Sequence, residues 1–209
     1  MRDVMTNRGP DHGGEWVGGH AALGHRRLSI IDLSPLGHQP MPNEDKSVWV
    51  TFNGEIYNFD KLRKELEAKG YKFRSHSDTE VIAHGYVEWG TGVVARLDGM
   101  FAIGVWDTRD GGEKLMLAVD RFGKKPLFYS KEGATIRFAS DSKAFWSLPD
   151  AKLTVNHAAI DCYLQHLAVT TEHTIWNEVD KLQPAHFMVV TRSGSHTERY
   201  WKPDFEHKI

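Results

Sequence analysis

The stretch that decides the fold is Val48-Trp49-Val50-Thr51-Phe52-Asn53-Gly54-Glu55-Ile56-Tyr57-Asn58. Its first five residues favour a β-strand, which runs into an Asn-Gly dipeptide. Asn-Gly after a strand is typical of a hairpin turn, because both residues tolerate positive φ. A hairpin needs a second alternating strand directly after the turn, and a helix pattern follows instead. We therefore expect Asn53-Gly54 at a corner between a strand and a helix.

Three features predict the helix that follows this corner. Asn58 stands at the expected N-cap, Leu62 and Leu66 are spaced four residues apart, and Gly70 follows as a stop signal. At such a corner a side-chain amide and an unobstructed backbone N–H can converge on one point. Two convergent donors are what an oxyanion requires.

The composition is that of a soluble globular protein, since 40% of the 209 residues are hydrophobic and 26% are charged. The net charge of −2 gives no electrostatic reason to expect binding to nucleic acid or to an anionic membrane. No apolar run is long enough to span a membrane, and we expect no signal peptide. A single cysteine excludes an internal disulfide, and we expect a cytoplasmic location. The 12 histidines are scattered, and no metal site is predicted.

The segment from Ala21 to Leu33 is expected to form a β-strand that contains two adjacent arginines. Because side chains alternate along a strand, Arg26 and Arg27 point to opposite faces, and one of them faces inward. A buried arginine needs an anionic partner. That partner is either a structural carboxylate or a substrate carboxylate held in the bidentate fork, and the sequence leaves both open.

A second helix is expected to begin at Ser77-Asp78-Thr79-Glu80, which has the form of a capping box. Val81, Ile82 and Tyr86 then form its apolar face. Asp78 has two interpretations. It is either an ordinary first-turn carboxylate favoured by the helix dipole, or a group that faces a cationic ligand.

The remaining pattern indicates stacked sheets with helices outside, and not a regular βαβ repeat. Gly99–Asp107 and most of Lys114–Val119 are apolar on both faces, so these strands are expected to be covered on both sides. The other elements expected are strands at Pro126–Ser130, Ile136–Ser140, Phe187–Thr191 and Thr197–Trp201, and a helix capped by Asn156 with Ile160, Leu164 and Leu167 on its apolar stripe.

Several separate stretches, taken in order, resemble the amino-terminal glutaminase domain of asparagine synthetases. Each is weak alone, but together they cover nearly the whole chain. The resemblance implies one class II glutamine amidotransferase domain over residues 1–209. It also implies an α+β fold of the N-terminal-nucleophile hydrolase type, an αββα four-layer sandwich of two antiparallel sheets. The stretches are Arg8-Gly9-Pro10-Asp11, Arg26-Arg27-Leu28-Ser29-Ile30-Ile31-Asp32, Asn53-Gly54-Glu55-Ile56-Tyr57-Asn58, Ser77-Asp78-Thr79-Glu80, Gly99-Met100-Phe101-Ala102, Asp120-Arg121-Phe122-Gly123 with Pro126-Leu127, Phe138-Ala139-Ser140 and Arg199-Tyr200-Trp201.

The resemblance further implies a glutamine site and a mechanism. An N-terminal cysteine thiolate would attack the glutamine side-chain amide, and the α-amine of that cysteine would act as base. Asn53 and the Gly54 N–H would stabilise the oxyanion, Arg27 would bind the α-carboxylate, and Asp78 with Glu55 would bind the α-ammonium. The residues implied for glutamine binding are Arg27, Leu28, Ser29, Ile30, Ile31, Asn53, Gly54, Glu55 and Asp78.

In this family the released ammonia passes to a second domain that uses ATP and Mg to amidate aspartate. The resemblance therefore implies glutamine and a C-terminal synthetase domain as partners, with no cofactor within residues 1–209. A homodimer is left open, and related amidotransferases serve acceptors other than aspartate.

One departure from the family concerns the nucleophile. The chain begins Met1-Arg2, and its only cysteine, Cys162, is expected inside a helix as a bystander thiol. The family's opening strand and first helix would precede Arg8, and its synthetase domain would follow Trp201. We therefore expect a truncated part of a glutamine-dependent asparagine synthetase, inactive by itself. The alternative is a non-catalytic relative that binds glutamine or a protein partner.

Overall fold

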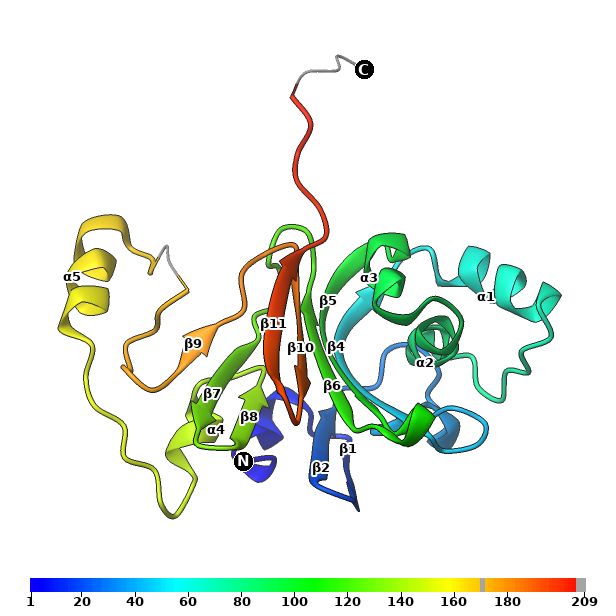
Figure 1. Ribbon diagram of the computed structural model, residues 1–209, viewed down its shortest axis with the longest axis horizontal. Coiled ribbons are helices and arrows are strands. Elements are labelled where there is room, and N and C mark those ends of the chain that lie inside the picture. The colour runs from blue at the N-terminus through cyan, green and yellow to red at the C-terminus, as the bar shows by residue number, and fades with distance from the viewer. Residues whose placement is uncertain (170–171, 206–209) are drawn as a thin grey trace.

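The computed structural model describes residues 1–169 and 172–205. A six-stranded antiparallel sheet, in the order β11-β10-β6-β5-β4-β3, forms its centre. Figure 1 shows helices α1, α2 and α3 on one side of this sheet and two smaller sheets, β1-β2 and β8-β7-β9, on the other side. The strands of the central sheet are β3 (Met41–Pro42), β4 (Val48–Ile56), β5 (Gly99–Asp107), β6 (Lys114–Val119), β10 (His186–Thr191) and β11 (Gly194–Arg199).

The smaller sheets are also antiparallel, and short helices complete the fold. The strands are β1 (His12–Gly18), β2 (Ala21–Arg27), β7 (Phe128–Glu132), β8 (Thr135–Ala139) and β9 (Asp180–Lys181). The helices are α1 (Phe59–Ala68), α2 (Asp78–Trp89), α3 (Val93–Arg96), α4 (Lys143–Trp146) and α5 (His157–His166), with 3-10 turns at η1 (Asp3–Arg8), η2 (Pro35–Gly37), η3 (Gly90–Gly92) and η4 (Arg109–Gly111).

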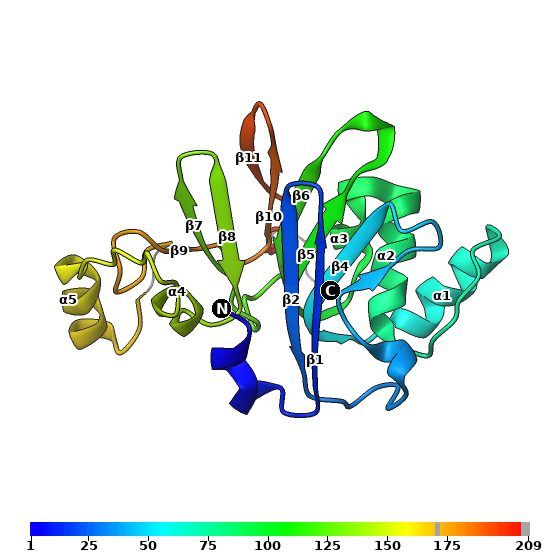
Figure 2. The ribbon, with the colours of Figure 1, turned by 90° about the horizontal axis from the view of Figure 1, so that it is seen from below.

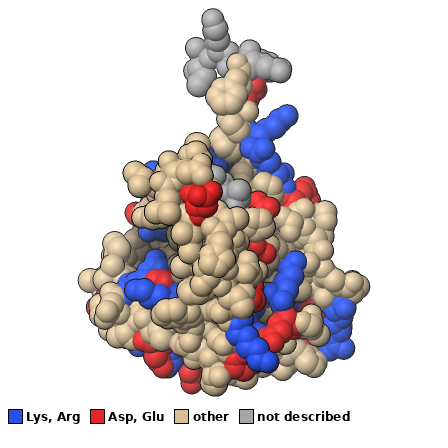
Figure 3. All heavy atoms as spheres, turned by 90° about the vertical axis from the view of Figure 1, so that its left-hand side faces the viewer, with Lys and Arg blue, Asp and Glu red and all other residues tan. Residues whose placement is uncertain are grey.

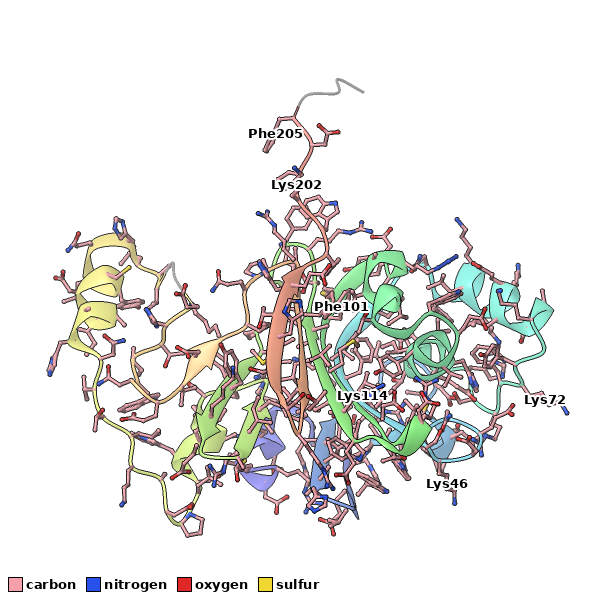
Figure 4. The ribbon with its side chains drawn as sticks, viewed as in Figure 1. Lys46, Lys72, Phe101, Lys114, Lys202 and Phe205 are labelled. Atoms are coloured by element: carbon pink, nitrogen blue, oxygen red, sulfur yellow. The ribbon has the colours of Figure 1, made fainter. Side chains whose placement is uncertain are left out.

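Two apolar cores lie on opposite faces of the central sheet. The first packs Phe101 and its neighbours from β4, β5 and β6 against α1, α2 and α3. Figure 4 places Phe101 inside this layer, while Lys46 and Lys72 project from its rim. The second core packs Leu117 and its neighbours against β2, β7 and β8. The prediction that β5 and β6 are covered on both sides is confirmed, because alternate side chains of each strand enter different cores.

Helices lie outside both sheet layers, as the α+β sandwich requires. α1, α2 and α3 cover the central sheet, and α4 buries Ala144 and Phe145 beside Ala139 of β8. The stripe predicted on α5 is not a core face, because Ile160, Leu164 and Leu167 are all exposed. The one side chain of α5 that the structure buries is Ala159.

Three local predictions require correction. Asn53-Gly54 lies within β4, which continues to Ile56, so the dipeptide stands neither in a hairpin nor at the strand-helix corner. β2 ends at Arg27 and not at Leu33, because its partner strand β1 begins at His12, the residue that pairs with Arg27. β1 was not predicted, since its glycines and polar residues hide the alternation. The start of α1 after Asn58 is confirmed, although the Asn58 side chain donates to the Arg96 carbonyl and does not cap the helix.

The outer surface carries both signs of charge. Figure 3 shows basic and acidic side chains interspersed on the face that it presents, in keeping with the net charge of −2. Among the described residues, no helix is long and apolar enough to cross a membrane. Nor do the described ranges hold a cluster of three or more histidine, cysteine or acidic residues suited to a metal ion.

Candidate functional site

One edge of β4 carries a row of backbone donors. The Phe52 N–H donates to Gln39 Oε1 at 2.7 Å, and the Ile56 N–H donates to Asp78 Oδ2 at 3.0 Å. Neither bond goes to β5, so these residues occupy the non-hydrogen-bonded positions of the β4–β5 ladder. By the same alternation the Gly54 N–H points outward between Gln39 and Asp78. The strand therefore presents the Gly54 N–H between two buried side chains.

The Asn53 side chain lies beside this edge and has an unused donor. Its Nδ2 is buried and has no hydrogen-bond partner among the described residues. A cavity of about 120 Å³ opens against it. A buried donor without an acceptor costs about 1–3 kcal/mol, so a ligand oxygen that accepts from Nδ2 would recover that free energy. The cavity is lined in part by His25, Thr51, Asn53, Gly104, Phe138 and Ser140.

Gly54 is required by the close approach of β5. A Cβ at this position would lie 2.0 Å from the Met100 carbonyl oxygen and 2.8 Å from Phe101 Cα. Any larger residue would push β4 away from β5 and move the adjacent N–H. Asn53 Nδ2 and the Gly54 N–H thus come from consecutive residues of β4, and the close packing of β5 against Gly54 fixes the position of this strand.

Arg27 is the inward-facing arginine of the adjacent pair, as predicted, and only 5% of it is exposed. Its Nη1 donates to the Ser34 carbonyl at 3.3 Å, and its Nη2 donates to the carbonyls of Ile31 and Asp32 at 2.9 and 2.5 Å. The described residues offer it no carboxylate within ion-pairing distance. The structural-carboxylate alternative is therefore not supported, and a buried cation remains for an anionic ligand.

Asp78 occupies the first turn of α2 and reaches back to β4. It is 5% exposed. Burial raises the pKa of Asp78, and the nearby Glu55 carboxylate adds to that rise, while the Ile56 N–H opposes it. The predicted capping box is wrong: Ser77 Oγ does accept from the Thr79 N–H at 3.2 Å, but Glu80 accepts from the backbone of the preceding loop. Two carboxylates beside one strand edge suit a cationic ligand group.

The loop after β2 holds the remaining residues predicted for the site. The Ser29 N–H donates to Asp11 Oδ2 at 2.7 Å, so that donor is occupied within the protein. The side chains of Leu28 and Ile30 are exposed, and the Ile31 carbonyl accepts from Arg27. The loop is tied to the segment before α2 by a bond from the His76 N–H to Asp32 Oδ2 at 2.7 Å. A chain of contacts thus connects Arg27 to Asp78 and to β4.

Comparison with known proteins identifies the family of the chain. A family model for the glutamine amidotransferase domain matches residues 1–201. The chain belongs to this amidotransferase family. It is 38% identical to asparagine synthetase [glutamine-hydrolyzing] 3 of Bacillus subtilis and 37% identical to asparagine synthetase 1 of the same organism, in each case over 99% of the chain. The chain spans about a third of the length of these relatives, 34% and 32% respectively.

A solved structure shows the same fold at lower sequence identity. Glutamine phosphoribosylpyrophosphate amidotransferase from B. subtilis superimposes with a TM-score of 0.64 over 90% of this chain and 36% of its own, at 21% identity. The N-terminal-nucleophile hydrolase fold expected from the sequence is confirmed.

The amidotransferase domain has an open slot between its two smaller sheets. β2 and β8 are end strands of their sheets, and both line the cavity beside Asn53. A second cavity of about 760 Å³ continues between the same two strands. Figure 2 shows β2 and β8 running alongside each other, with the β10–β11 hairpin visible in the gap between them.

Cys162 lies outside the amidotransferase site. It is on α5, and its Sγ lies 3.6 Å from the Ala168 carbonyl oxygen. Figures 1 and 2 both place α5 at the end of the molecule opposite α1, well away from β4. The prediction that this thiol does not serve the site agrees with its position.

Sequence reasoning missed two residues of the candidate site. Gln39 spans from the Phe52 N–H to Thr79 Oγ1, and His25 lines the cavity with Nδ1 3.3 Å from Thr51 Oγ1. A single glutamine before a proline gives no sequence signal. Because side chains alternate along a strand, His25 lies on the same face of β2 as Arg27, and this is the one clue that the sequence offers.

His25 predicts a loss of stability in mild acid. Burial lowers the pKa of His25 from 6.5 to about 4, and the charges of Arg27 and His12 add to the effect. Between pH 6.5 and pH 4, His25 is protonated in the unfolded chain and neutral in the folded chain. The free energy of unfolding therefore falls as the pH drops from 6.5 toward 4. We expect a loss of about 3 kcal/mol from this group. Urea unfolding across this pH range measures it. His25→Gln should remove that part of the slope and His20→Gln should not; equal slopes in all three proteins would contradict the assignment.

Proposed function

We propose that this domain hydrolyses glutamine and supplies ammonia for the ATP-dependent amidation of aspartate, as part of a glutamine-dependent asparagine synthetase. The observation that carries the proposal is the buried Asn53 Nδ2, which has no partner among the described residues and stands beside the outward Gly54 N–H. The asparagine synthetases of B. subtilis, which carry this domain in about a third of their length, support the choice of acceptor.

Residues of opposite charge bind the two charged groups of glutamine. Arg27 has Nε–H and one Nη1–H without a partner among the described residues, and one of these charged donors binds the α-carboxylate. Asp78 and Glu55 bind the α-ammonium. Attack on the side-chain amide converts its carbonyl into an oxyanion, which accepts from Asn53 Nδ2 and the Gly54 N–H. Each donor is in place before reaction, so no reorganisation is needed as the charge forms.

The slot between β2 and β8 is where we place the nucleophile. A strand entering it would run along the cavity wall that contains Asn53. An N-terminal cysteine on that strand would bring its thiolate and its α-amine close to Asn53 and Gly54. The thiolate displaces ammonia to give a thioester, and water then releases glutamate and restores the thiol. The proposed role of residues 1–209 is therefore binding and oxyanion stabilisation.

The proposal extends to partners and cofactors. Residues 1–209 use no cofactor of their own in this scheme, and ATP with Mg acts in a C-terminal synthetase domain. The domain assignment over 1–209, the homodimer and the cytoplasmic location stay predictions.

Ammonia release from glutamine tests the proposal directly. We expect no ammonia release above background from the chain alone. We expect sustained release from the extended protein, which is this chain preceded by a segment that begins with cysteine. Replacing that cysteine with alanine must abolish the release. Activity of the chain alone that Cys162→Ala removes would contradict the proposal. Glutamine binding without hydrolysis in the extended protein would favour the non-catalytic alternative.

Arg27→Ala should raise KM for glutamine in the extended protein. Loss of a charge-assisted hydrogen bond costs about 1.5–3 kcal/mol, which corresponds to about 10- to 150-fold in KM. Arg27→Lys should also raise KM, because a single ammonium cannot serve both the loop carbonyls and a carboxylate. Arg96→Ala is the matched control, since this arginine pairs with Glu65 at the surface. Steady-state kinetics measures the change, and an unaltered KM in Arg27→Ala would refute the assignment.

A further inference from the structure

Asp32 joins the two loops that border the site. Its Oδ2 accepts from the His76 N–H at 2.7 Å, in the loop before α2. Its Oδ1 accepts from the Ser34 N–H at 3.0 Å and from Ser34 Oγ at 2.5 Å, in its own loop. Its carbonyl accepts from Arg27 Nη2. One residue therefore contacts the buried arginine and the segment that leads into Asp78.

The turn made by Asp32 does not by itself explain these contacts. Asp45 forms the same turn, accepting from the Ser47 N–H at 2.9 Å and from Ser47 Oγ at 2.5 Å. Its contacts within the described residues stay inside 43–47. Asp32 uses its second oxygen to reach a loop 44 positions further along the chain. A local turn needs one carboxylate oxygen, and the bridge needs both.

Both the backbone conformation and the ionisation state of Asp32 suit this bridging role. Its φ of 53° is uncommon for a residue with a side chain and requires surrounding contacts to hold it. Burial acts to raise the pKa of Asp32, but the hydrogen bonds from Ser34 and His76 and the charge of Arg27 outweigh it and lower the pKa. The carboxylate is thus ionised at neutral pH and accepts on both oxygens.

We propose that Asp32 is a positioning residue that sets the separation between the carboxylate-binding and ammonium-binding ends of the glutamine site. The two groups of an amino acid are attached to one carbon atom, so Arg27 and Asp78 must be fixed relative to each other. Asp78 is held to β4 through Ile56, and Asp32 holds the loop of Arg27 to the segment two residues before Asp78. This inference rests on the proposed function, because it assumes that glutamine is the ligand.

The test compares Asp32→Asn with Asp45→Asn in the chain as it exists. Asparagine tolerates positive φ but has one acceptor oxygen, so it cannot accept from both Ser34 and His76. Two quantities are measured: hydrogen exchange of the His76 amide by NMR, and the Kd for L-glutamine by calorimetry. For Asp32→Asn we expect exchange at least ~10-fold faster and a Kd raised at least ~5-fold, as loss of a charge-assisted bond predicts. For Asp45→Asn both should stay within about twofold of the parent.

A second variant removes the donor of the hydrogen bond between the His76 N–H and Asp32. His76→Pro removes the donor N–H and leaves Asp32 in place. It should raise the Kd for glutamine by a factor similar to that of Asp32→Asn. In the extended protein, Asp32→Asn should raise KM and leave kcat within about threefold, since the oxyanion donors are untouched; a merely structural role would lower kcat through loss of folded protein.

The outcomes separate the two proposals. A parent chain that binds glutamine, with an unchanged Kd in both Asp32→Asn and His76→Pro, would overturn the positioning role and leave the proposed function intact. A parent chain and extended protein that both fail to bind glutamine would overturn the proposed function and, with it, this role. A raised Kd in Asp32→Asn and His76→Pro, with Asp45→Asn unaffected, supports the role.

Discussion

Asn53→Ala is expected to lower kcat for glutamine hydrolysis by about 10²- to 10³-fold in the protein that carries its nucleophile. Removal of one donor from an oxyanion hole costs about 3–4 kcal/mol of transition-state stabilisation. The Asn53 Nδ2 has no other partner among the described residues, so its deletion breaks no internal hydrogen bond. The loss should therefore appear in kcat, while KM and the midpoint of thermal unfolding stay close to those of the parent. Ammonia release under saturating glutamine measures it.

Asn58→Ala provides the matched control for this prediction. Asn58 is a second amide close to the end of the same strand, but its Nδ2 donates to the Arg96 carbonyl and its Oδ1 accepts from the Asp98 N–H. Its loss should reduce stability and leave kcat within a few-fold of the parent. If Asn53→Ala keeps kcat while Asn58→Ala changes only stability, Asn53 does not stabilise the oxyanion. A parallel fall in kcat and in folded protein for Asn53→Ala would likewise contradict its role.

The site could be predicted from the sequence only where a motif marked it. Asn53 and Gly54 were identified first from the local pattern, and the roles of Arg27 and Asp78 through the resemblance. The structure connects their segments through Asp32 and Ile56. Local pattern alone left Arg27 and Asp78 between structural and binding roles. The bridge made by Asp32 could not be predicted, because it depends on a bond to a loop that is distant in sequence. Such contacts leave no periodic signal.

The fold was predictable where burial is uniform. β5 and β6 were identified because a strand covered on both faces carries an unbroken apolar run. Prediction failed where tertiary contacts replace local rules. The carboxylate of Glu80 sits at the capping-box position but accepts from the loop backbone at Arg74 and Ser75. The stripe of α5 has the right period, yet the described residues do not cover it.

Asp120→Ala is expected to lower the free energy of unfolding by at least ~4 kcal/mol. Asp120 is 1% exposed and its carboxylate accepts from four backbone N–H groups. Each buried donor left without an acceptor costs about 1–3 kcal/mol. A typical domain has only about 5–15 kcal/mol of stability, so this variant should be close to unfolded at 37 °C. Urea unfolding monitored by tryptophan fluorescence measures the change. The donors are the N–H groups of Phe101, Phe122, Lys124 and Lys125, at 3.0 to 3.1 Å.

The matched control and the consequence for the site follow from the same bonds. Among the described residues the Asp141 side chain accepts from one backbone N–H, that of Lys143 at 3.0 Å, and pairs with the partly exposed Arg8 at 3.5 Å. Asp141→Ala should therefore cost about 1 kcal/mol. Phe101 stands opposite Gly54 in the β4–β5 register, which makes Asp120 the support behind the oxyanion strand. Asp120→Asn should be intermediate in stability, because its amide keeps one acceptor oxygen. Equal losses in the free energy of unfolding for Asp120→Ala and Asp141→Ala would show that the four hydrogen bonds do not stabilise the fold. Asp120 would then not be what holds β5 in place beside β4.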